Sequence, residues 1–323
     1  MEHPQPSLSR EGEVKLRMLE VGVCGTDRAL CAFEFGATPA GSDYFVLGHE
    51  ALAEVMDTGE LVVCGVRQPC EDAECDACRS GRQDFCVTGR YTERGILGAH
   101  GFMTEFVVAD ARSLYRVPRE LRDVAVLIEP LTIAEKAFLQ FQAIDSRTPW
   151  RKERRRAAVL GAGPVGLLGA MLFRAAGFEV WVCSREPRSI VAEAIGAEYV
   201  HSLAGVGQID VVYEAMGAPQ AAFDALQYLG ANGVFVFTGV PLASEPLSLD
   251  LHSLMRRLIM RNQAIVGTVN AGADAFERAV ADLAQFHARW PRALASMITG
   301  RYPLERFREA LRDPGIKNVI KLR

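Results

Sequence analysis

The chain has 323 residues, of which 49% are hydrophobic and 24% are charged, and its formal net charge at pH 7 is −4. This length exceeds what one hydrophobic core usually supports, so we expect two domains. The mildly acidic balance argues against nucleic acid or an anionic membrane as a partner, and no apolar stretch approaches the ~20 residues that span a bilayer. The N-terminus lacks a basic region followed by an apolar one, so we expect a cytoplasmic protein.

The N-terminal part of the chain has the pattern of β-strands. Residues 13–23 and 45–66 alternate apolar with polar side chains and are rich in valine and glycine, as strands and tight turns are. They predict a β-rich domain.

A cysteine cluster follows these strands. Its members are separated by four, two and seven residues, and they are Cys70, Cys75, Cys78 and Cys86. Cytoplasmic cysteines are more often metal ligands or buried thiols than disulfides. Four thiolates in one short loop predict a closed, structural zinc site, the alternative being incidental surface thiols.

From about residue 132, helical patterns with a period of 3.6 alternate with short apolar runs. We expect helices at 132–141, 165–176, 189–195, 220–229 and 251–261, and strands at 157–160, 179–183, 210–213, 234–237 and 264–266. This alternation predicts a parallel, doubly wound sheet with helices on both faces. An amphipathic helix at 276–286 and an apolar run at 318–322 are expected to complete the first domain. The expected domains are therefore 1–132 plus 269–323, and 133–268.

A glycine-rich turn connects the first strand of this second domain to its first helix. It reads Gly161-Ala162-Gly163-Pro164-Val165-Gly166. In this context the glycines permit a tight turn and let the backbone approach a pyrophosphate at a helix N-terminus. We interpret the turn as a dinucleotide site, although a glycine-rich turn without a ligand is the alternative.

The end of the second strand predicts which dinucleotide binds. An NAD enzyme places Asp or Glu there to bind the ribose 2′-hydroxyl. Here the strand at 179–183 ends in Ser184-Arg185, so a guanidinium is available for the 2′-phosphate of NADP. We expect NADP in preference to NAD. Glu186 leaves dual use open, and Arg185 could also be an ordinary exposed side chain.

Cys24, His49 and Glu129, with Glu50 directly after the histidine, predict a catalytic zinc site. Thiolate, neutral imidazole and carboxylate give Zn²⁺ two negative charges and leave a fourth tetrahedral position open. Zinc in such a site lowers the pKa of a substrate hydroxyl, which prepares its carbon to lose a hydride to the cofactor. Thr26 is placed to pass the released proton to the cofactor ribose, and Glu50 to act as an outer-shell group or transient ligand.

With these motifs in place, the chain resembles the zinc-dependent medium-chain dehydrogenase/reductase superfamily and, within it, the archaeal-type glucose (aldose) 1-dehydrogenases. The resemblance extends from Glu13 onward and is carried by Glu20–Asp27, Val46–Ala51, Gly81–Cys86, Glu93–Ile96, His100–Phe106, Leu127–Lys136 and Gly267–Asn270.

The resemblance implies a GroES-like catalytic domain and a Rossmann domain. It implies transfer of a hydride from C1 of an aldose, glucose or galactose, to NADP, which yields the aldonolactone. It further implies that Glu93 and Glu129 contact the sugar, that Asn270 faces both substrate and nicotinamide, and that the protein is a homotetramer or dimer.

The sequence departs from this family at several positions. The chain starts late relative to the family's first β-hairpin, and the connection at 56–62 is short. Two extra residues separate Cys70 from Cys75, which leaves open whether Cys70 or Asp72 is the first structural ligand. By the same resemblance, Val66 occupies a region where family members place a polar sugar contact.

Two other functions stay open at the level of the sequence. One is an alcohol or polyol dehydrogenase with the same metal and cofactor. The other is a catalytically silent nucleotide-binding protein, which the complete ligand set disfavours.

Overall fold

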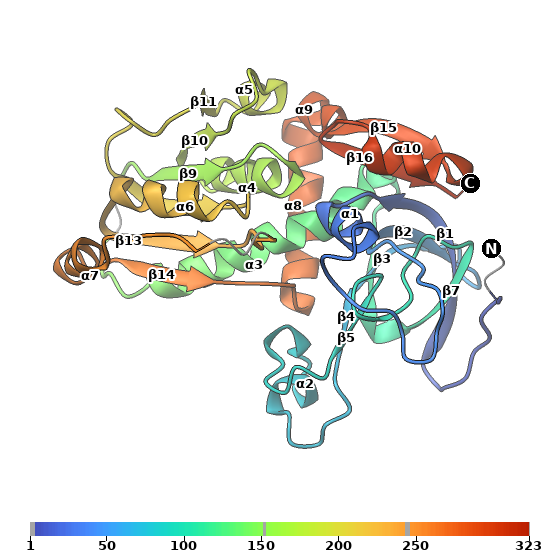
Figure 1. The fold of residues 1–323 in the computed structure, drawn as a ribbon. Helices are drawn as coiled ribbons and strands as arrows, with labels where there is room; N and C mark the ends of the chain where they lie inside the picture. The colour runs from blue at the N-terminus through green and yellow to red at the C-terminus, as the bar shows by residue number, and fades with distance from the viewer. Residues whose placement is uncertain (1–3, 151–152, 243–245, 323) are drawn as a thin grey trace. The chain divides into compact units, whose positions relative to one another are not determined.

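The computed structural model describes residues 4–150, 153–242 and 246–322. The chain folds into two compact units (Figure 1). Unit 1 comprises Met1–Thr132 and Asn270–Arg323, and unit 2 comprises Ile133–Val269. Among the described residues, none of the helices combines the length and apolar character needed to cross a membrane.

Unit 1 is built on a seven-stranded sheet in the order β15-β16-β1-β2-β3-β8, with β7 also pairing β1. Its strands are β1 (Glu13–Gly22), β2 (Glu50–Val55), β3 (Leu61–Cys64), β7 (Phe106–Asp110), β8 (Leu114–Arg116), β15 (Ile298–Pro303) and β16 (Lys317–Lys321). The strands β2, β7 and β16 all run antiparallel to β1. The pairing of β16 with β1 brings the C-terminal strand into the N-terminal sheet.

Alternation of side chains along β1 explains why this segment forms a strand. Leu16 and Met18 are fully buried, while Lys15 and Arg17, which alternate with them, are partly exposed, because successive side chains of a strand point to opposite faces. The buried residues pack in one core with Val62 of β3 and with residues of β2 and β7.

The remaining elements of unit 1 are short, except for one long helix. A three-stranded sheet consists of β4 (Arg67–Gln68), β5 (Thr92–Arg94) and β6 (Gly98–Ala99). The helices are α1 (Gly25–Cys31), α2 (Asp76–Arg79), α8 (Ala273–Arg289), α9 (Pro291–Met297) and α10 (Phe307–Arg312). The segment that carries α2 extends from β4 and β5 as a separate lobe (Figure 1).

Unit 2 contains a six-stranded sheet in the order β11-β10-β9-β12-β13-β14, in which all neighbours are parallel. The strands are β9 (Arg156–Leu160), β10 (Glu179–Cys183), β11 (Glu198–Val200), β12 (Ile209–Glu214), β13 (Leu229–Phe237) and β14 (Ala264–Gly267). The helices are α3 (Ile128–Asp145, which begins in unit 1), α4 (Pro164–Ala175), α5 (Ile190–Ala194), α6 (Pro219–Ala225) and α7 (Leu251–Met260). This strand order is that of a dinucleotide-binding fold.

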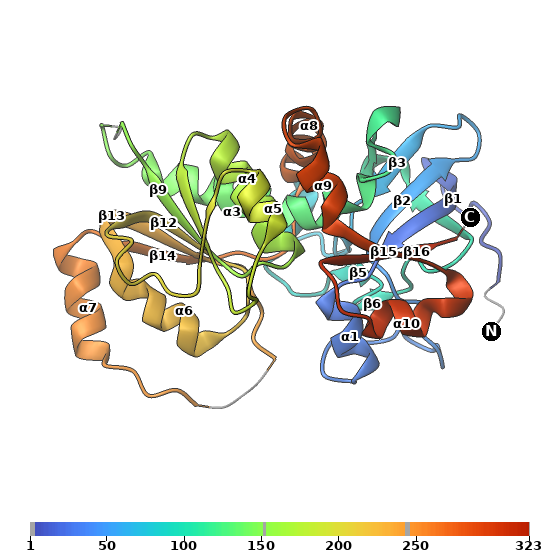
Figure 2. The ribbon, with the colours of Figure 1, turned by 90° about the horizontal axis from the view of Figure 1, so that it is seen from above.

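Helices cover both faces of the unit 2 sheet (Figures 1 and 2). On one face, Ala222 and Ala225 of α6 and Leu254 of α7 pack against the sheet. On the other face, the rings of Phe138 of α3 and Phe173 of α4 lie 5.3 Å apart, and Phe173 lies 6.1 Å from Tyr213 of β12. These layers confirm the expected doubly wound architecture.

Several boundaries differ from those expected from the sequence. The helix expected at 220–229 ends at Ala225, and Leu229 instead begins β13, because its fully buried side chain belongs to the core of the sheet. The strands β11 and β15 and the helices α1 and α9 were not expected. β11 spans Glu198–Val200 and contains no fully buried residue, so it lacks the apolar run that marks a core strand.

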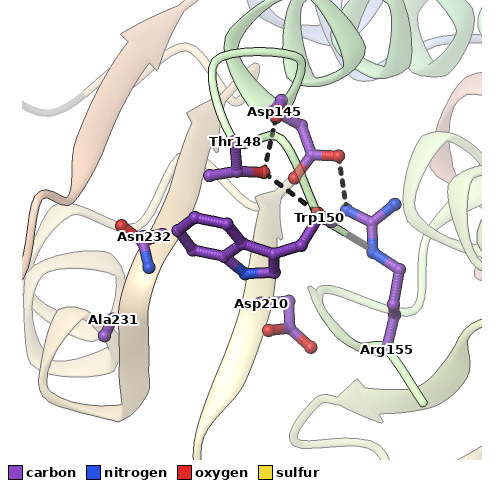
Figure 3. Close-up of a pocket in the computed structure, with 7 residues that line it drawn as sticks. All are labelled: Asp145, Thr148, Trp150, Arg155, Asp210, Ala231 and Asn232. Carbon is purple, nitrogen blue, oxygen red and sulfur yellow. Dashed lines mark hydrogen bonds and ion pairs between the residues drawn. The ribbon is translucent and has the colours of Figure 1, made fainter. Parts of the chain in front are cut away.

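A small pocket of unit 2 lies at the end of the sheet where β9 and β12 begin (Figure 3). Its lining residues are Asp145, Thr148, Trp150, Arg155, Asp210, Ala231 and Asn232. An ion pair of 2.9 Å between Arg155 and Asp145 forms part of its wall. In open α/β sheets ligands bind outside the carboxyl ends of the strands. This pocket lies at the amino ends of β9 and β12, so we do not assign it to the nucleotide.

Candidate functional site

The structure brings Cys24, His49 and Glu50 together in unit 1. One potential ligand atom from each lies within 4.8 Å of the others. Cys24 follows β1 and Glu50 begins β2, and the antiparallel register places Gly22 opposite Glu50. A Cβ atom at position 22 would lie 2.2 Å from Glu50 Oε2, so only glycine leaves room for this carboxylate. Pairing of β1 with β2 therefore assembles the cluster.

Asp27, which was not expected from the sequence, organises this cluster. Its side chain is fully buried and accepts hydrogen bonds from the backbone N–H of Cys24 at 2.8 Å and of Gly48 at 3.2 Å. Its Oδ1 lies 3.6 Å from His49 Nδ1. Burial opposes the charge on His49, but Asp27 outweighs this effect and holds the pKa of His49 well above its ordinary value. Because Nδ1 faces Asp27, Nε2 is left as the candidate metal ligand. A carboxylate that holds the second ring nitrogen in this way is usual for a histidine that binds a metal.

Glu129 lies at the start of α3 and is buried, with 9% of its surface exposed. Burial raises its pKa to about 7, with His49 lowering and Glu50 raising it. Glu129 therefore interacts electrostatically with the cluster. Its carboxylate is not one of the atoms within 4.8 Å of each other, which come from Cys24, His49 and Glu50.

A buried lysine neutralises Glu50. Lys317 Nζ donates to Glu50 Oε1 at 2.6 Å, contacts Oε2 as well, and donates to the carbonyl of Val23 at 3.1 Å. Only 2% of the Lys317 side chain and 1% of the Glu50 side chain are exposed. Because Glu50 has its own cation, Cys24 and Glu129 are left as the anionic candidates for a metal. Sequence reasoning missed Lys317, although a lysine next to a buried apolar run indicates a buried partner.

Thr26 stands beside this group. Its Oγ1 lies 3.8 Å from Cys24 Sγ. The hydroxyl is thus at the edge of the cluster, where a proton could be received from a molecule bound there.

The second cysteine group lies in the lobe that carries α2. The Sγ atoms of Cys70, Cys75, Cys78 and Cys86 lie within 4.8 Å of one another. Asp72 is elsewhere engaged, since it pairs with Arg90. A hydrogen bond from Thr88, together with its cysteine neighbours, lowers the pKa of Cys86 to about 6, as suits a thiolate ligand. All eight cysteines are free.

Glu93 lies on β5 with 8% of its surface exposed. Asn270 Nδ2 donates to Glu93 Oε1 at 2.9 Å, so the structure joins the two residues that the family resemblance assigned to the sugar. Arg67, which sequence reasoning did not identify, donates to the same oxygen from Nε at 3.0 Å.

The glycine-rich turn of unit 2 has the form that a dinucleotide requires. Gly161 follows β9 with a φ of +110°, and Gly163 caps the N-terminus of α4. A Cβ atom on Gly166 would lie 2.1 Å from the carbonyl oxygen of Gly161, whereas one on Gly163 would meet nothing within 4 Å. Gly166 thus closes the turn, and Gly163 leaves open space in front of the helix. Pro164 and Val165 begin α4, whose N-terminus favours an anion.

The loop after β10 presents Arg185 to solvent. Glu186 is engaged by the hydroxyl of Ser184, whose hydrogen bond lowers the pKa of Glu186. Arg188 is held by Glu193 through contacts of 2.9 Å. Arg185 is exposed and makes no ion pair within the described part of the chain, so its guanidinium is available to a ligand phosphate.

Known proteins are similar to this chain over nearly its whole length. The family profile described as "Alcohol dehydrogenase GroES-like domain" matches residues 10–119, and the profile described as "Glucose dehydrogenase C-terminus" matches residues 122–322. The glucose 1-dehydrogenase of Methanocella arvoryzae is 39% identical, over 100% of this chain and 93% of that protein. That of Thermoproteus tenax is 39% identical, over 96% of this chain and 90% of that protein.

A solved structure is similar over the same length. It is the glucose dehydrogenase of Haloferax mediterranei in complex with NADP, Zn and gluconolactone. The TM-score is 0.91 at 34% identity, and the alignment covers 100% of this chain and 95% of that one.

Proposed function

Because the chain belongs to the glucose dehydrogenase family of zinc-dependent medium-chain dehydrogenases, we propose that it oxidises an aldose at C1 with NADP⁺. The sugar loses a hydride from C1 and a proton from the hydroxyl on C1, and NADP⁺ is reduced to NADPH. The product is the aldonolactone. The observation that carries this proposal is the joint presence of the Cys24–His49–Glu50 group, in which His49 and Glu50 are buried, and the nucleotide turn, in a chain similar throughout to enzymes of this activity.

The residues present fit a zinc ion. Cys24 and His49 would hold it together with Glu129, and a polarising cation there lowers the pKa of a sugar hydroxyl. Glu50, neutralised by Lys317, is an outer-shell group. In the lobe, Cys70, Cys75, Cys78 and Cys86 would hold a structural zinc, with Cys70 preferred over Asp72, which is paired with Arg90.

The chain's own side chains provide the rest of the chemistry. Asp27 orients the His49 ring. Thr26 Oγ1 accepts the proton from the C1 hydroxyl and passes its own hydroxyl proton toward the cofactor ribose and solvent, which takes up the proton that the reaction releases. Glu93 accepts a hydrogen bond from another sugar hydroxyl, and Asn270, whose Nδ2 already donates to Glu93, lies beside the same hydroxyl.

The residues of unit 2 fit NADP. The backbone from Gly161 to Gly166 and the N-terminus of α4 would hold the pyrophosphate. Ser184 and Arg185 would bind the 2′-phosphate, since Arg185 is exposed and Glu186 is hydrogen-bonded to Ser184. We therefore assign the substrate and zinc to a domain of residues 1–132 plus 269–323, and the nucleotide to residues 133–268.

We also propose a cytoplasmic homo-oligomer. Eight free cysteines suit a reducing compartment. The strand β14 lies at the edge of its sheet, and the preceding helix α7 exposes an apolar stripe at helical spacing, with Leu251 66%, Met255 64% and Ile259 60% exposed. An exposed apolar stripe and the edge of a sheet are both surfaces that a second copy would cover. Light scattering of wild type and Met255→Glu tests this, with the variant expected to have the smaller mass.

Zinc content combined with a screen of NADP⁺ reduction across aldoses, polyols and simple alcohols tests the proposed activity. We expect turnover of aldoses and formation of lactone. Cys24→Ser should lose nearly all turnover and keep the fold, because an open metal site contributes more to chemistry than to the scaffold. Oxidation of polyols or simple alcohols alone would favour the alternative dehydrogenase, and no turnover with any of them would indicate a silent relative.

A further inference from the structure

Arg67 is a buried arginine that forms an ion pair with the carboxylate of Glu93. Only 6% of its surface is exposed. Strands β4 and β5 are antiparallel with Arg67 directly opposite Glu93. Its Nε donates to Glu93 Oε1 at 3.0 Å, and its Nη2 lies 3.0 Å from the same oxygen. This cross-strand pair fixes the carboxylate from one side.

Asn270 fixes the same oxygen from another direction. Its Nδ2 donates to Glu93 Oε1 at 2.9 Å, while its Oδ1 accepts the backbone N–H of Ala271 at 2.8 Å, which settles the orientation of the amide. Among the described residues, Oε1 therefore accepts every hydrogen bond that a side chain donates to the Glu93 carboxylate. Oε2 keeps its lone pairs for a ligand.

Arg67 is itself held in place. Its guanidinium lies over the ring of Tyr91, 3.7 Å from the centroid, and its Nη1 donates to the carbonyl of Asp84 at 3.5 Å. A planar guanidinium can stack on an aromatic ring and donate at the same time, which a lysine ammonium cannot reproduce. The arginine is therefore a rigid support for Glu93.

The turn after Glu93 lies against the segment that carries His49. Gly95 has a φ of +72°, and a Cβ atom there would lie 2.3 Å from the carbonyl oxygen of Gly48. Gly48 directly precedes His49. The carboxylate that Arg67 supports is thus attached to a backbone packed against the candidate catalytic cluster.

From this geometry we propose that Arg67 is a positioning residue that saturates Glu93 Oε1 and so presents Oε2 as a fixed acceptor for one hydroxyl of the sugar. The proposal rests on the proposed function, in which Glu93 binds the substrate. A carboxylate oxygen accepts and does not donate, so this position selects a substrate that offers a hydroxyl. An analogue without that hydroxyl leaves Oε2 unpaired.

A double-mutant comparison tests this role. We would measure kcat and KM for D-glucose in wild type, Arg67→Met, Glu93→Gln and the double variant, all loaded with zinc. The lost charge-assisted hydrogen bond should raise KM about tenfold in Arg67→Met, with a smaller change in kcat. In the Glu93→Gln background, the same arginine substitution should change KM less than about twofold, because an amide NH2 replaces the Oε2 acceptor that Arg67 presents to the sugar. Arg67→Lys should recover only part of the wild-type affinity.

A binding measurement complements the kinetics. Gluconolactone should raise the melting temperature of wild type more than that of Arg67→Met. Arg116→Met serves as the matched control, since Arg116 forms an exposed 2.9 Å pair with Glu60, and its KM should equal that of wild type. If Arg67→Met does not fold, Arg67→Gln, which retains an amide donor, supports the same comparison.

Two results would overturn the inference while leaving the proposed function intact. One is an equal rise in KM on substituting Arg67 in both backgrounds, which would indicate general structural damage. The other is an unchanged KM in Arg67→Met beside a raised KM in Glu93→Gln. A wild type that oxidises no aldose would overturn the proposed function and, with it, this role for Arg67.

Discussion

Replacing Lys317 with methionine removes the cation from the most buried ion pair near the candidate catalytic cluster. Lys317 Nζ lies 2.6 Å from Glu50 Oε1, and the two side chains are 2% and 1% exposed. Burial opposes the charge on Lys317, but Glu50 and Cys24 outweigh it and keep the pKa of Lys317 above its ordinary value. Methionine keeps an unbranched side chain that is one atom shorter, and it leaves Glu50 charged and without this cation.

The expected loss of stability is large. Breaking a buried pair by removing one partner costs about 3–5 kcal/mol, because the remaining charge is uncompensated. At roughly 2–4 °C per kcal/mol for a domain of this size, the melting temperature should fall by roughly 6–20 °C. The double variant Glu50→Gln/Lys317→Met removes both charges and should recover most of the loss.

Calorimetry on proteins of verified zinc content, at fixed ionic strength, measures both changes. A single variant within about 1 kcal/mol of wild type, a shift of roughly 2–4 °C, would refute the reasoning. So would a double variant as unstable as the single one, since the loss would then not come from the stranded carboxylate.

Three further predictions concern the metals and the cofactor. Cys78→Ser should lower the zinc content by about one ion per chain and reduce the melting temperature. Cys31→Ser, at an exposed cysteine, is the control and should change neither quantity. Unchanged zinc content in Cys78→Ser would argue against a structural site. Arg185→Ala should raise KM for NADP⁺ about tenfold and leave KM for NAD⁺ nearly constant. Arg188→Ala is the control, because Arg188 is held by Glu193. An unaltered cofactor preference in Arg185→Ala would exclude Arg185 as the residue that binds the 2′-phosphate. In the metal-free protein burial raises the pKa of Glu129 to about 7, above that of an unfolded carboxyl group, so below pH 7 a proton competes with zinc. Zinc affinity should therefore fall more steeply below pH 7 in wild type than in Glu129→Gln, which lacks this titrating carboxyl group. Equal slopes in calorimetric titrations would contradict this.

The sequence predicted those parts of the molecule that depend on neighbouring residues. The alternation of strands and helices from β9 to β14, with a glycine turn between β9 and α4, is encoded locally, because each segment carries its own apolar period. The clustering of four cysteines in the α2 lobe is likewise expressed in their spacing. Local signals failed at β11, a short strand without fully buried residues.

The residues that sequence reasoning missed act across long sequence separations. Lys317 reaches Glu50 over 267 positions of sequence, and Arg67 reaches Glu93 over 26. Neither contact has a local period in the sequence. Arg67 meets Glu93 only when β4 pairs with β5, and Lys317 meets Glu50 only when β16 and β2 pair with the two edges of β1. Asp27 is closer to Cys24, but its contact with His49 also depends on the pairing of β1 with β2. A charged residue within or beside an apolar segment of the sequence indicates that this residue is buried with a partner of opposite charge. It does not identify that partner.

Glucose deuterated at C1 tests most directly whether the chain transfers the hydrogen on C1 of an aldose to NADP⁺. Incubation with the zinc-loaded protein and NADP⁺, followed by mass spectrometry and NMR of the products, locates the label. We predict deuterium on the nicotinamide ring of NADPH and an unlabelled gluconolactone. Deuterium retained in the oxidised sugar beside unlabelled NADPH, or no reduction of NADP⁺ by any aldose, would contradict this transfer.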